Sequence, residues 1–89
     1  MDIRNKASAG TMQSSDLMVM VTPSATLQVD VESTVKIQFE HLIRAQIQAT
    51  LEALEVTSGH FQISDRGALD YAIAARVETA IHRAAGEEQ

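Results

Sequence analysis

The fold is decided by residues 27–54, LQVDVESTVKIQFEHLIRAQIQATLEAL, because the spacing of the apolar side chains changes part of the way along. From Leu27 to Glu32 apolar and polar residues alternate, which is typical of a half-buried strand. Ser33 or Thr34 can then cap a helix. The apolar stripe of that helix, with spacings of three and four residues, comprises Val35, Phe39, Leu42, Ile43, Ile47, Leu51 and Leu54. One continuous segment therefore predicts both a strand and an amphipathic helix.

The residues before this segment predict more of the sheet. Leu17–Val21 is a strand candidate with apolar side chains on both faces, and Thr11–Gln13 is a shorter candidate. A polar turn at residues 14–16 separates the two. Met18 and Met20 share a face, and they either lie beneath a helix or another strand or form an adaptable docking surface. Together with the alternating segment, these candidates predict an antiparallel hairpin or a three-stranded meander.

The residues after the first helix predict one more strand and one more helix. His60–Ile63 is a short strand candidate, and a turn at Ser64–Gly67 leads into the second helix. The inner stripe of this helix comprises Leu69, Ile73, Val77, Ala80, Ile81 and Ala84, and Gly86 is a suitable C-cap. The expected order is β-β-β-α-β-α, an α+β fold in which two helices pack on one face of a small sheet.

Length and composition exclude several classes of protein. The 89 residues are expected to form a single domain, with residues 1–9 and 87–89 as flexible tails. The net charge is −5, and the scattered basic residues lack the clustered face of a nucleic-acid-binding protein. The chain has no cysteine, so neither a disulfide nor a thiolate zinc site can form. No apolar stretch approaches the roughly 18 residues of a membrane span, and a soluble cytoplasmic domain is expected.

The histidines and carboxylates do not form a recognisable catalytic or metal site. His41, His60 and His82 lack the spacing that places two ligands on one helix face, so we predict no catalytic histidine and no metal. Asp65 and Asp70 flank the start of the second helix, where negative charge is favourable. The sequence contains no glycine-rich phosphate loop and no nucleophile elbow. A catalytic role is therefore not expected.

Ser14 lies in the polar break before the strand candidate, where another enzyme can reach its hydroxyl. From residue type alone, a serine in a turn is usually structural. Two motifs change that interpretation. They are Ala9-Gly10-Thr11 with Ser14-x-Asp16, and Asp65-Arg66-Gly67-Ala68-Leu69-Asp70 followed by Ala75-Arg76-x-Glu78. With both motifs at their expected separation, the chain resembles the acyl carrier (gamma) subunit of citrate lyase over roughly Ala9 to Gly86.

The resemblance implies a carrier subunit and not a catalyst. In that family a serine bears a covalently attached 2′-(5″-phosphoribosyl)-3′-dephospho-CoA arm, and the matching position here is Ser14. An alpha subunit exchanges acetyl for citryl on the thiol of the arm, and a beta subunit cleaves the citryl thioester to oxaloacetate. The other implied partners are the transferase that attaches the arm and the ligase that loads it with acetate; neither nucleic acid nor a membrane is expected. The absence of cysteine agrees, because the arm would supply the thiol.

Two neighbours of Ser14 carry open questions. Asp16 either orients the attachment loop, is recognised by the attaching transferase, or is only a turn residue whose carboxylate caps local amides. Ser15 departs from the family pattern, in which a glycine is expected between the modified serine and the aspartate. The substitution restricts the backbone locally, because serine tolerates a positive φ poorly. Ser15 also adds a second hydroxyl, so the choice of Ser14 depends on the alignment.

Two other functions are compatible with the residues. The acyl carrier subunit of malonate decarboxylase uses the same kind of arm at a similar Ser-x-Asp turn, although the run at residues 65–70 favours the citrate lyase type. A non-covalent adaptor would instead bind its partner through Met18, Met20 or the acidic helix faces, without any modification. Ordinary phosphopantetheine carriers are disfavoured, because they place Asp-Ser-Leu at a helix start, whereas residues 15–17 here precede a strand.

Overall fold

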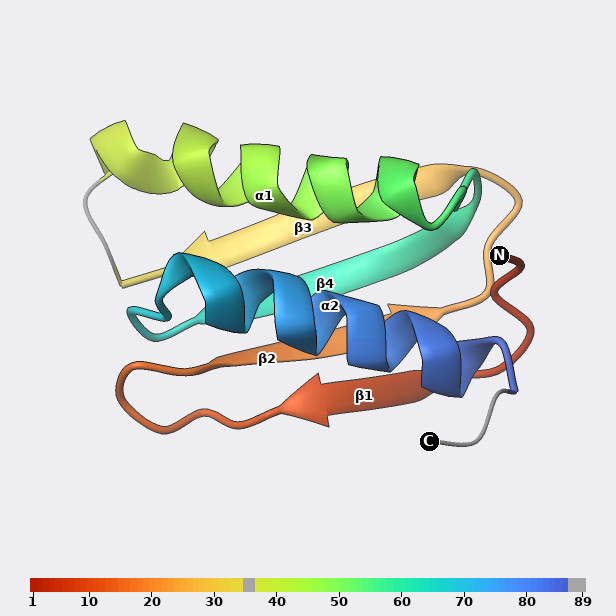
Figure 1. The fold of residues 1–89 in the computed structure, drawn as a ribbon, viewed down its shortest axis with the longest axis horizontal. Coiled ribbons are helices and arrows are strands. Elements are labelled where there is room, and N and C mark those ends of the chain that lie inside the picture. Colours follow the sequence, from red (N-terminus) through yellow and green to blue (C-terminus); the bar gives the residue numbers. More distant parts are fainter. Residues whose placement is uncertain (35–36, 87–89) are drawn as a thin grey trace.

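The computed structural model describes residues 1–34 and 37–86, and it confirms an α+β fold with the expected order of elements (Figure 1). The strands and helices are β1 (Ala7–Gly10), β2 (Leu17–Thr22), β3 (Leu27–Ser33), the 3-10 turn η1 (Ile37–Phe39), α1 (Glu40–Ala53), β4 (Gly59–Asp65) and α2 (Asp70–Ala84). None of the helices within these residues is long and apolar enough to cross a bilayer. The predicted tail at residues 87–89 lies outside the described residues.

The strand order, β1-β2-β4-β3, differs from the predicted meander. β2 is antiparallel to both β1 and β4, whereas β3 is parallel to β4 and does not pair with β2. The predicted three-stranded meander is therefore wrong, although β1 and β2 do form an antiparallel hairpin. The physical reason is α1, because a helical crossover returns the chain to the end of the sheet where β3 began, and β4 can then pair with β3 only in parallel.

The first strand lies earlier in the chain than predicted. β1 occupies Ala7–Gly10, so the expected strand at Thr11–Gln13 is wrong, and so is the expected tail over residues 7–9. The backbone amides of Arg4 and Asn5 also donate to the carbonyl of Ala84 at the end of α2. β1 consists of small residues with little strand propensity. Its conformation is imposed by pairing with β2, which the residues of β1 alone do not reveal.

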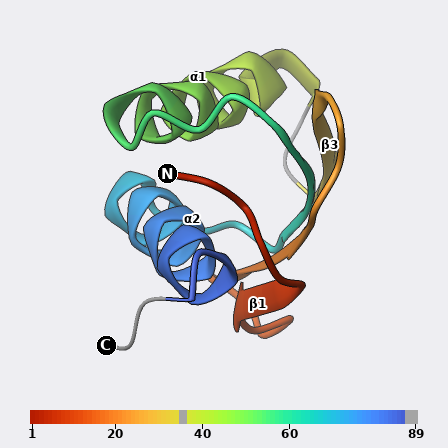
Figure 2. The ribbon, with the colours of Figure 1, turned by 90° about the vertical axis from the view of Figure 1, so that its right-hand side faces the viewer.

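Both helices cover the same face of the sheet, as predicted (Figure 2). Every second residue of β2 and β4 faces the helices and is buried. The buried hydrophobic side chains of the two strands are Leu17, Val19, Val21, Phe61 and Ile63. α2 packs on β1 and β2, and α1 packs on α2. Within residues 1–34 and 37–86, no helix lies over the opposite face of the sheet (Figure 2). Met20 lies there with 46% of its surface exposed, so the interpretation that it is covered by another element is wrong.

The beginning of α1 differs most from the sequence expectation. Its middle is buried through Ile43, Ile47 and Leu51, as predicted. Phe39 and Leu42, however, are 46% and 53% exposed. The helix begins only at Glu40, after a 3-10 turn. Phe39 belongs to that turn, which has three residues per turn instead of 3.6, so its side chain is rotated out of the stripe. Leu42 lies in α1 itself, about 100° around the helix from the buried Ile43, at the edge of the buried face.

Neither predicted cap of α1 is used. Ser33 is the last residue of β3, and its hydroxyl donates to Asp65 instead; Thr34 follows the strand, and its backbone amide donates to the carbonyl of Asp65. Val35, a member of the predicted inner stripe, lies outside the described residues. α2 follows its prediction more closely, because only Leu69, the residue before the helix, is exposed in its predicted stripe.

One end of the sheet brings together the segments that the sequence singled out. Leu17 pairs with Asp65, which also pairs with Ser33, and Gly10 pairs with Met18 beside them. The loop that joins β1 to β2 therefore lies at the same end as the starts of α1 and α2 (Figure 1).

Candidate functional site

Ser14 and Ser15 lie exposed in the loop between β1 and β2. The amide of Asp16 donates to the carbonyl of Gln13 at 3.2 Å, which closes the turn around the two serines. At the base of the loop, the amide of Thr11 donates to the carbonyl of Leu17 at 3.1 Å. Within the described residues, the hydroxyl of Ser14 has no hydrogen-bond partner. The loop therefore presents the Ser14 hydroxyl to solvent.

Asp16 is the centre of a hydrogen-bond network at the end of this loop. Its Oδ2 accepts the hydroxyl of Thr11 at 2.7 Å, and its Oδ1 accepts the backbone amide of Leu17 at 2.8 Å. The guanidinium of Arg76 donates to both carboxylate oxygens, through Nε at 3.1 Å and Nη2 at 3.0 Å. This arrangement is a bidentate arginine–carboxylate pair, which is the strong geometry for such a pair.

These contacts lower the pKa of Asp16 to about 2. The hydrogen bonds from Arg76 are the largest cause, followed by the hydroxyl of Thr11, while burial opposes them. The side chain of Asp16 is 15% exposed and that of Arg76 is 43% exposed, so the pair is partly shielded from water. At neutral pH Asp16 is therefore an ionised carboxylate that holds the loop against α2.

Arg76 is not among the predicted site residues. It projects from α2, next to the buried Val77, and its partner is sixty residues away in the chain. Arg76 does belong to the second motif of the family resemblance, which was the available signal. No local pattern, however, shows that an arginine on a helix contacts an aspartate in a distant loop.

The other side of the loop is tied to the residue after β4. The amide of Ser15 donates to the carbonyl of Arg66 at 2.8 Å, and the amide of Arg66 donates to the carbonyl of Asp16 at 2.9 Å. These two bonds continue the pairing of β2 with β4 past the end of the regular sheet. Ser15 and Asp16 are thus fixed on two sides, by the backbone of Arg66 and by α2.

The backbone of the loop needs positive φ at two places. Gly10 has a φ of +94°, and a Cβ there would lie 1.9 Å from the carbonyl oxygen of Leu17, so only glycine fits. Ser15 has a φ of 66°, the left-handed conformation that a glycine would adopt more easily. This is the position at which the resemblance predicts a glycine.

Asp65 and Asp70 have different surroundings despite their shared motif. Asp65 is buried, and its carboxylate accepts the hydroxyl of Ser33 at 2.8 Å and the amide of Ala68 at 2.9 Å. It fixes the turn from β4 into α2. Asp70 is exposed in the first turn of α2, where its charge suits the helix dipole.

The histidines lie apart from the loop. His41 is exposed on α1, His60 contacts Asp30 at 2.7 Å across the open face of the sheet, and His82 lies 3.7 Å from Glu78 on α2. In the part of the chain that the structure describes, no three metal-ligating side chains gather into a site.

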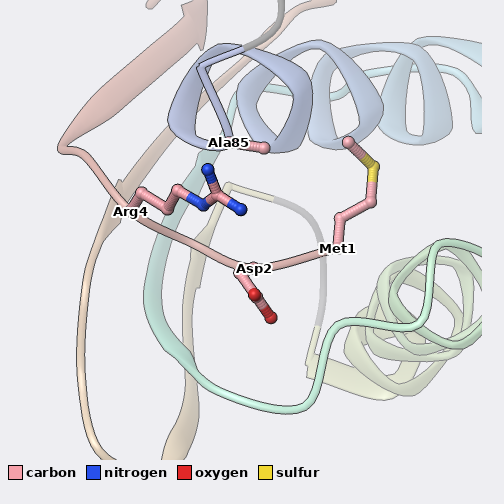
Figure 3. A pocket seen from close by; sticks show the side chains of 4 residues that line it. All are labelled: Met1, Asp2, Arg4 and Ala85. Atoms are coloured by element: carbon pink, nitrogen blue, oxygen red, sulfur yellow. The ribbon is translucent and has the colours of Figure 1, made fainter.

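A cavity of about 390 Å³ lies between the first residues and the end of α2, lined by Met1, Asp2, Arg4 and Ala85. In Figure 3 the side chains of Met1 and Arg4 reach toward the end of α2, while that of Asp2 points away from it. The N-terminus, whose first residue lines this cavity, lies at the end of the molecule opposite the loop between β1 and β2, the Ser14 loop (Figure 1). It brings together no group of side chains suited to catalysis, so the Ser14 loop is the better candidate site.

Known proteins show the same sequence pattern and the same fold. Residues 4–84 match a family model of acyl carrier type, described as the malonate decarboxylase delta subunit. The chain is 45% identical to the citrate lyase acyl carrier protein of Halothermothrix orenii, an alignment that covers 94% of this chain and 90% of that protein. It is also 45% identical to the protein of that name from Streptococcus pyogenes serotype M4, over 100% of this chain and 89% of that one.

A solved structure has a similar fold at lower identity. A chain in the crystal structure of a Pseudomonas malonate decarboxylase hetero-tetramer in complex with malonate superposes with a TM-score of 0.72 at 23% identity. The match covers 91% of this chain and 84% of that one, and at this identity it supports the fold alone. From the sequence matches, the chain belongs to the citrate lyase acyl carrier protein family, and it is a carrier subunit and not a catalyst.

Proposed function

We propose that this chain is the acyl carrier subunit of a citrate lyase, and that it carries a phosphoribosyl-dephospho-CoA arm esterified to the hydroxyl of Ser14. The observation that carries the proposal is the geometry of the loop. The Ser14 hydroxyl is exposed and has no partner among the described residues, while the residues on either side of it are held by Asp16, Arg76 and Arg66. An enzyme can reach the hydroxyl without first unfolding the loop.

The chemistry of the surrounding residues fits such an arm. The phosphates of the arm are anionic, and two of the seven basic side chains in the chain, Arg66 and Arg76, flank the loop. The protein has no cysteine, so any thioester must form on sulfur from an attached group. When attached, the arm supplies the thiol that carries the acyl group.

Ser14 contributes the oxygen of the ester bond and nothing else to the chemistry. As the bond from its oxygen to phosphorus forms, the leaving group of the activated arm departs from that phosphorus, and the proton of the hydroxyl must go to a base. The structure offers this proton no acceptor among the described residues. Asp16 is also unsuited as a general acid, because its pKa of about 2 keeps it ionised at neutral pH. We therefore assign the general base to the attaching transferase, and to Asp16 the role of shaping the loop that this enzyme recognises.

The partners proposed from this function are the alpha and beta subunits of citrate lyase, the attaching transferase and the ligase that loads acetate. A tether of fixed length keeps the thioester at a high effective concentration near both lyase active sites. The carrier then needs only an anchor point and a surface that each partner can recognise. The exposed loop at one end of a rigid sheet meets the first requirement.

The test is to treat the chain with the attaching transferase and an activated form of the arm, and to measure intact mass. Wild type and Ser15→Ala should gain the mass of one arm, and Ser14→Ala should gain none. Peptide mapping should place the modification on residue 14. An equal mass gain in Ser14→Ala would contradict the proposal, and loss of the gain in Ser15→Ala alone would move the site by one residue.

A second assay separates citrate lyase from the related decarboxylase. The family model that matches residues 4–84 carries the name malonate decarboxylase delta subunit, so that rival has specific support. The loaded chain should support citrate cleavage with citrate lyase alpha and beta subunits, and it should not support malonate decarboxylation with the corresponding decarboxylase subunits. If the chain were instead an adaptor that carries no modification, the wild type and Ser14→Ala would support its partners equally well.

A further inference from the structure

Two arginines flank the Ser14 loop, and they differ in how firmly they are held. Arg76 donates two hydrogen bonds to Asp16, a carboxylate that is only 15% exposed. Arg66 donates a single bond to another side chain, through Nη2 to Glu32 at 3.1 Å, and the side chain of Glu32 is 72% exposed. We propose that Arg66 is a phosphate-binding residue for the arm, exchanging Glu32 for a phosphate close to Ser14. This inference depends on the proposed function.

The backbone places Arg66 beside the attachment point. Its amide and its carbonyl are both bonded to the loop, to Asp16 and Ser15 respectively, at 2.9 and 2.8 Å. Ser15 is the immediate neighbour of Ser14 in the chain. The backbone of Arg66 is therefore fixed within one residue of the proposed ester, and only its side chain needs to move.

The side chain of Arg66 is on the open face of the sheet. Alternation along a strand places Arg66 on the face opposite Asp65, and Asp65 points inward to the hydroxyl of Ser33. Glu32, next to Ser33 in β3, contacts Arg66 on the outer face. Figure 2 shows no helix of the described residues over this face. The side chain of Arg66 is 26% exposed and that of Glu32 is 72% exposed, so a phosphate approaching from solvent reaches the guanidinium when Glu32 moves aside.

The present partners of Arg66 are easily replaced. An ion pair with a largely exposed carboxylate contributes little to stability, and salt weakens it further. The second contact, from Nη1 to the carbonyl of Asp65 at 3.3 Å, is long. Arginine forms forked hydrogen bonds with phosphate that are stronger than one bond to an exposed carboxylate. Arg76 cannot substitute, because leaving Asp16 would leave a partly buried carboxylate without its charge partner.

The experiment compares the protein before and after arm attachment by nuclear magnetic resonance, with intact mass confirming each form. In wild type, attachment should shift the Nε–H resonance of Arg66 and leave that of Arg44 unchanged. Arg44 is the matched control, since it is also an arginine with one carboxylate partner, the half-buried Glu40 at 3.4 Å. An Arg66 resonance that does not move would overturn the inference.

The phosphorus spectrum gives an independent readout. In the loaded protein, Arg66→Gln should shift the ³¹P resonance of the phosphate nearest the ester and narrow it, because that phosphate becomes free to move, and Arg44→Gln should leave it unchanged. Glu32→Gln should shift it in the opposite direction by removing the competitor. Identical phosphorus spectra for both arginine variants would contradict the inference.

Other outcomes are equally decisive. If the transferase cannot load Arg66→Gln, the inference is decided by the Arg66 resonance of the wild type before and after arm attachment, because that comparison needs no substitution. A third outcome combines two results: the transferase loads Arg66→Gln slowly, and the Arg66 resonance of the wild type does not move on loading. It would mean that Arg66 is recognised by the transferase and does not bind the arm, which overturns the inference. If wild type gains no mass at all, the proposed function fails, and that result is separate from a failure of Arg66.

Discussion

The two helices have similar lengths and similar amphipathic sequences, yet they serve the fold differently. α2 packs on β1 and β2, and its predicted inner residues from Ile73 to Ala84 are buried. α1 packs on α2, and only three of its residues are buried, while Leu42 is exposed. α2 also provides Arg76, which holds the Ser14 loop. The comparison indicates that α2 connects the core to the candidate site and that α1 mainly covers the core.

The largest expected difference is between matched truncations on the two helices. Ile73→Ala should lower the free energy of unfolding by about 2–5 kcal/mol, because it leaves a cavity in the core. Leu42→Ala should change it by no more than about 0.5 kcal/mol, because Leu42 is 53% exposed. Urea denaturation of both variants checks this. Equal losses would show that α1 is as important to the core as α2.

A substitution at Gly10, at the end of β1 beneath α2, should lower the free energy of unfolding almost as much. Gly10→Ala places a Cβ 1.9 Å from the carbonyl oxygen of Leu17, with φ at +94°. We expect a loss of about 2–4 kcal/mol from left-handed strain and crowding together. Gly67→Ala is the control, since its φ is also positive, at +89°, but a Cβ there would meet nothing within 4 Å. Gly67→Ala should therefore show only the strain, and similar losses in both variants would rule out the crowding.

The link between α2 and the loop is tested through Asp16. Asp16→Asn should lower the free energy of unfolding at pH 7 by about 1–2 kcal/mol, less than the full pKa shift implies because Arg76 is 43% exposed. The pKa of Asp16 falls from 3.8 to about 2 on folding. Its contribution is therefore complete above about pH 4 and is lost as the pH falls toward 2. The difference between wild type and variant should shrink over that range in urea denaturation series.

A double-mutant cycle with Arg76→Gln isolates the pair. If Asp16 and Arg76 stabilise the protein through each other, the double variant should lose less stability than the sum of the two single variants. Arm attachment should slow in each single variant, because the loop is no longer held in one conformation. Two results would contradict the assigned link. One is that the stability losses of the two single variants add up in the double variant. The other is that the stability difference between wild type and Asp16→Asn does not change with pH.

The smallest expected effect is at Ser15. Ser15→Gly should raise the free energy of unfolding by up to about 1 kcal/mol, because glycine adopts the φ of 66° without steric cost. The gain is limited by the greater freedom of glycine in the unfolded chain. Arm attachment to residue 14 should be unaffected, which intact mass would show. A destabilised variant would mean that the Ser15 side chain contributes more than its conformation costs.

The sequence alone determined the features that depend only on residues close together in the chain. The alternation in β3, the stripes of α1 and α2 and the polar break before β2 are local periodicities, and each follows from the spacing of apolar side chains along one element. The α+β class and the exposure of Ser14 are consequences of these patterns. The serine at position 15, where the resemblance predicts a glycine, also indicated where the backbone takes a positive φ.

Only the tertiary structure decided which distant residues meet. The parallel pairing of β3 with β4, the strand nature of Ala7–Gly10 and the outward turn of Leu42 depend on contacts between separate elements. The contact between Asp16 and Arg76 joins residues sixty positions apart. Such contacts form only after the core has brought the elements together, so the periodicity of a single segment holds no information about them.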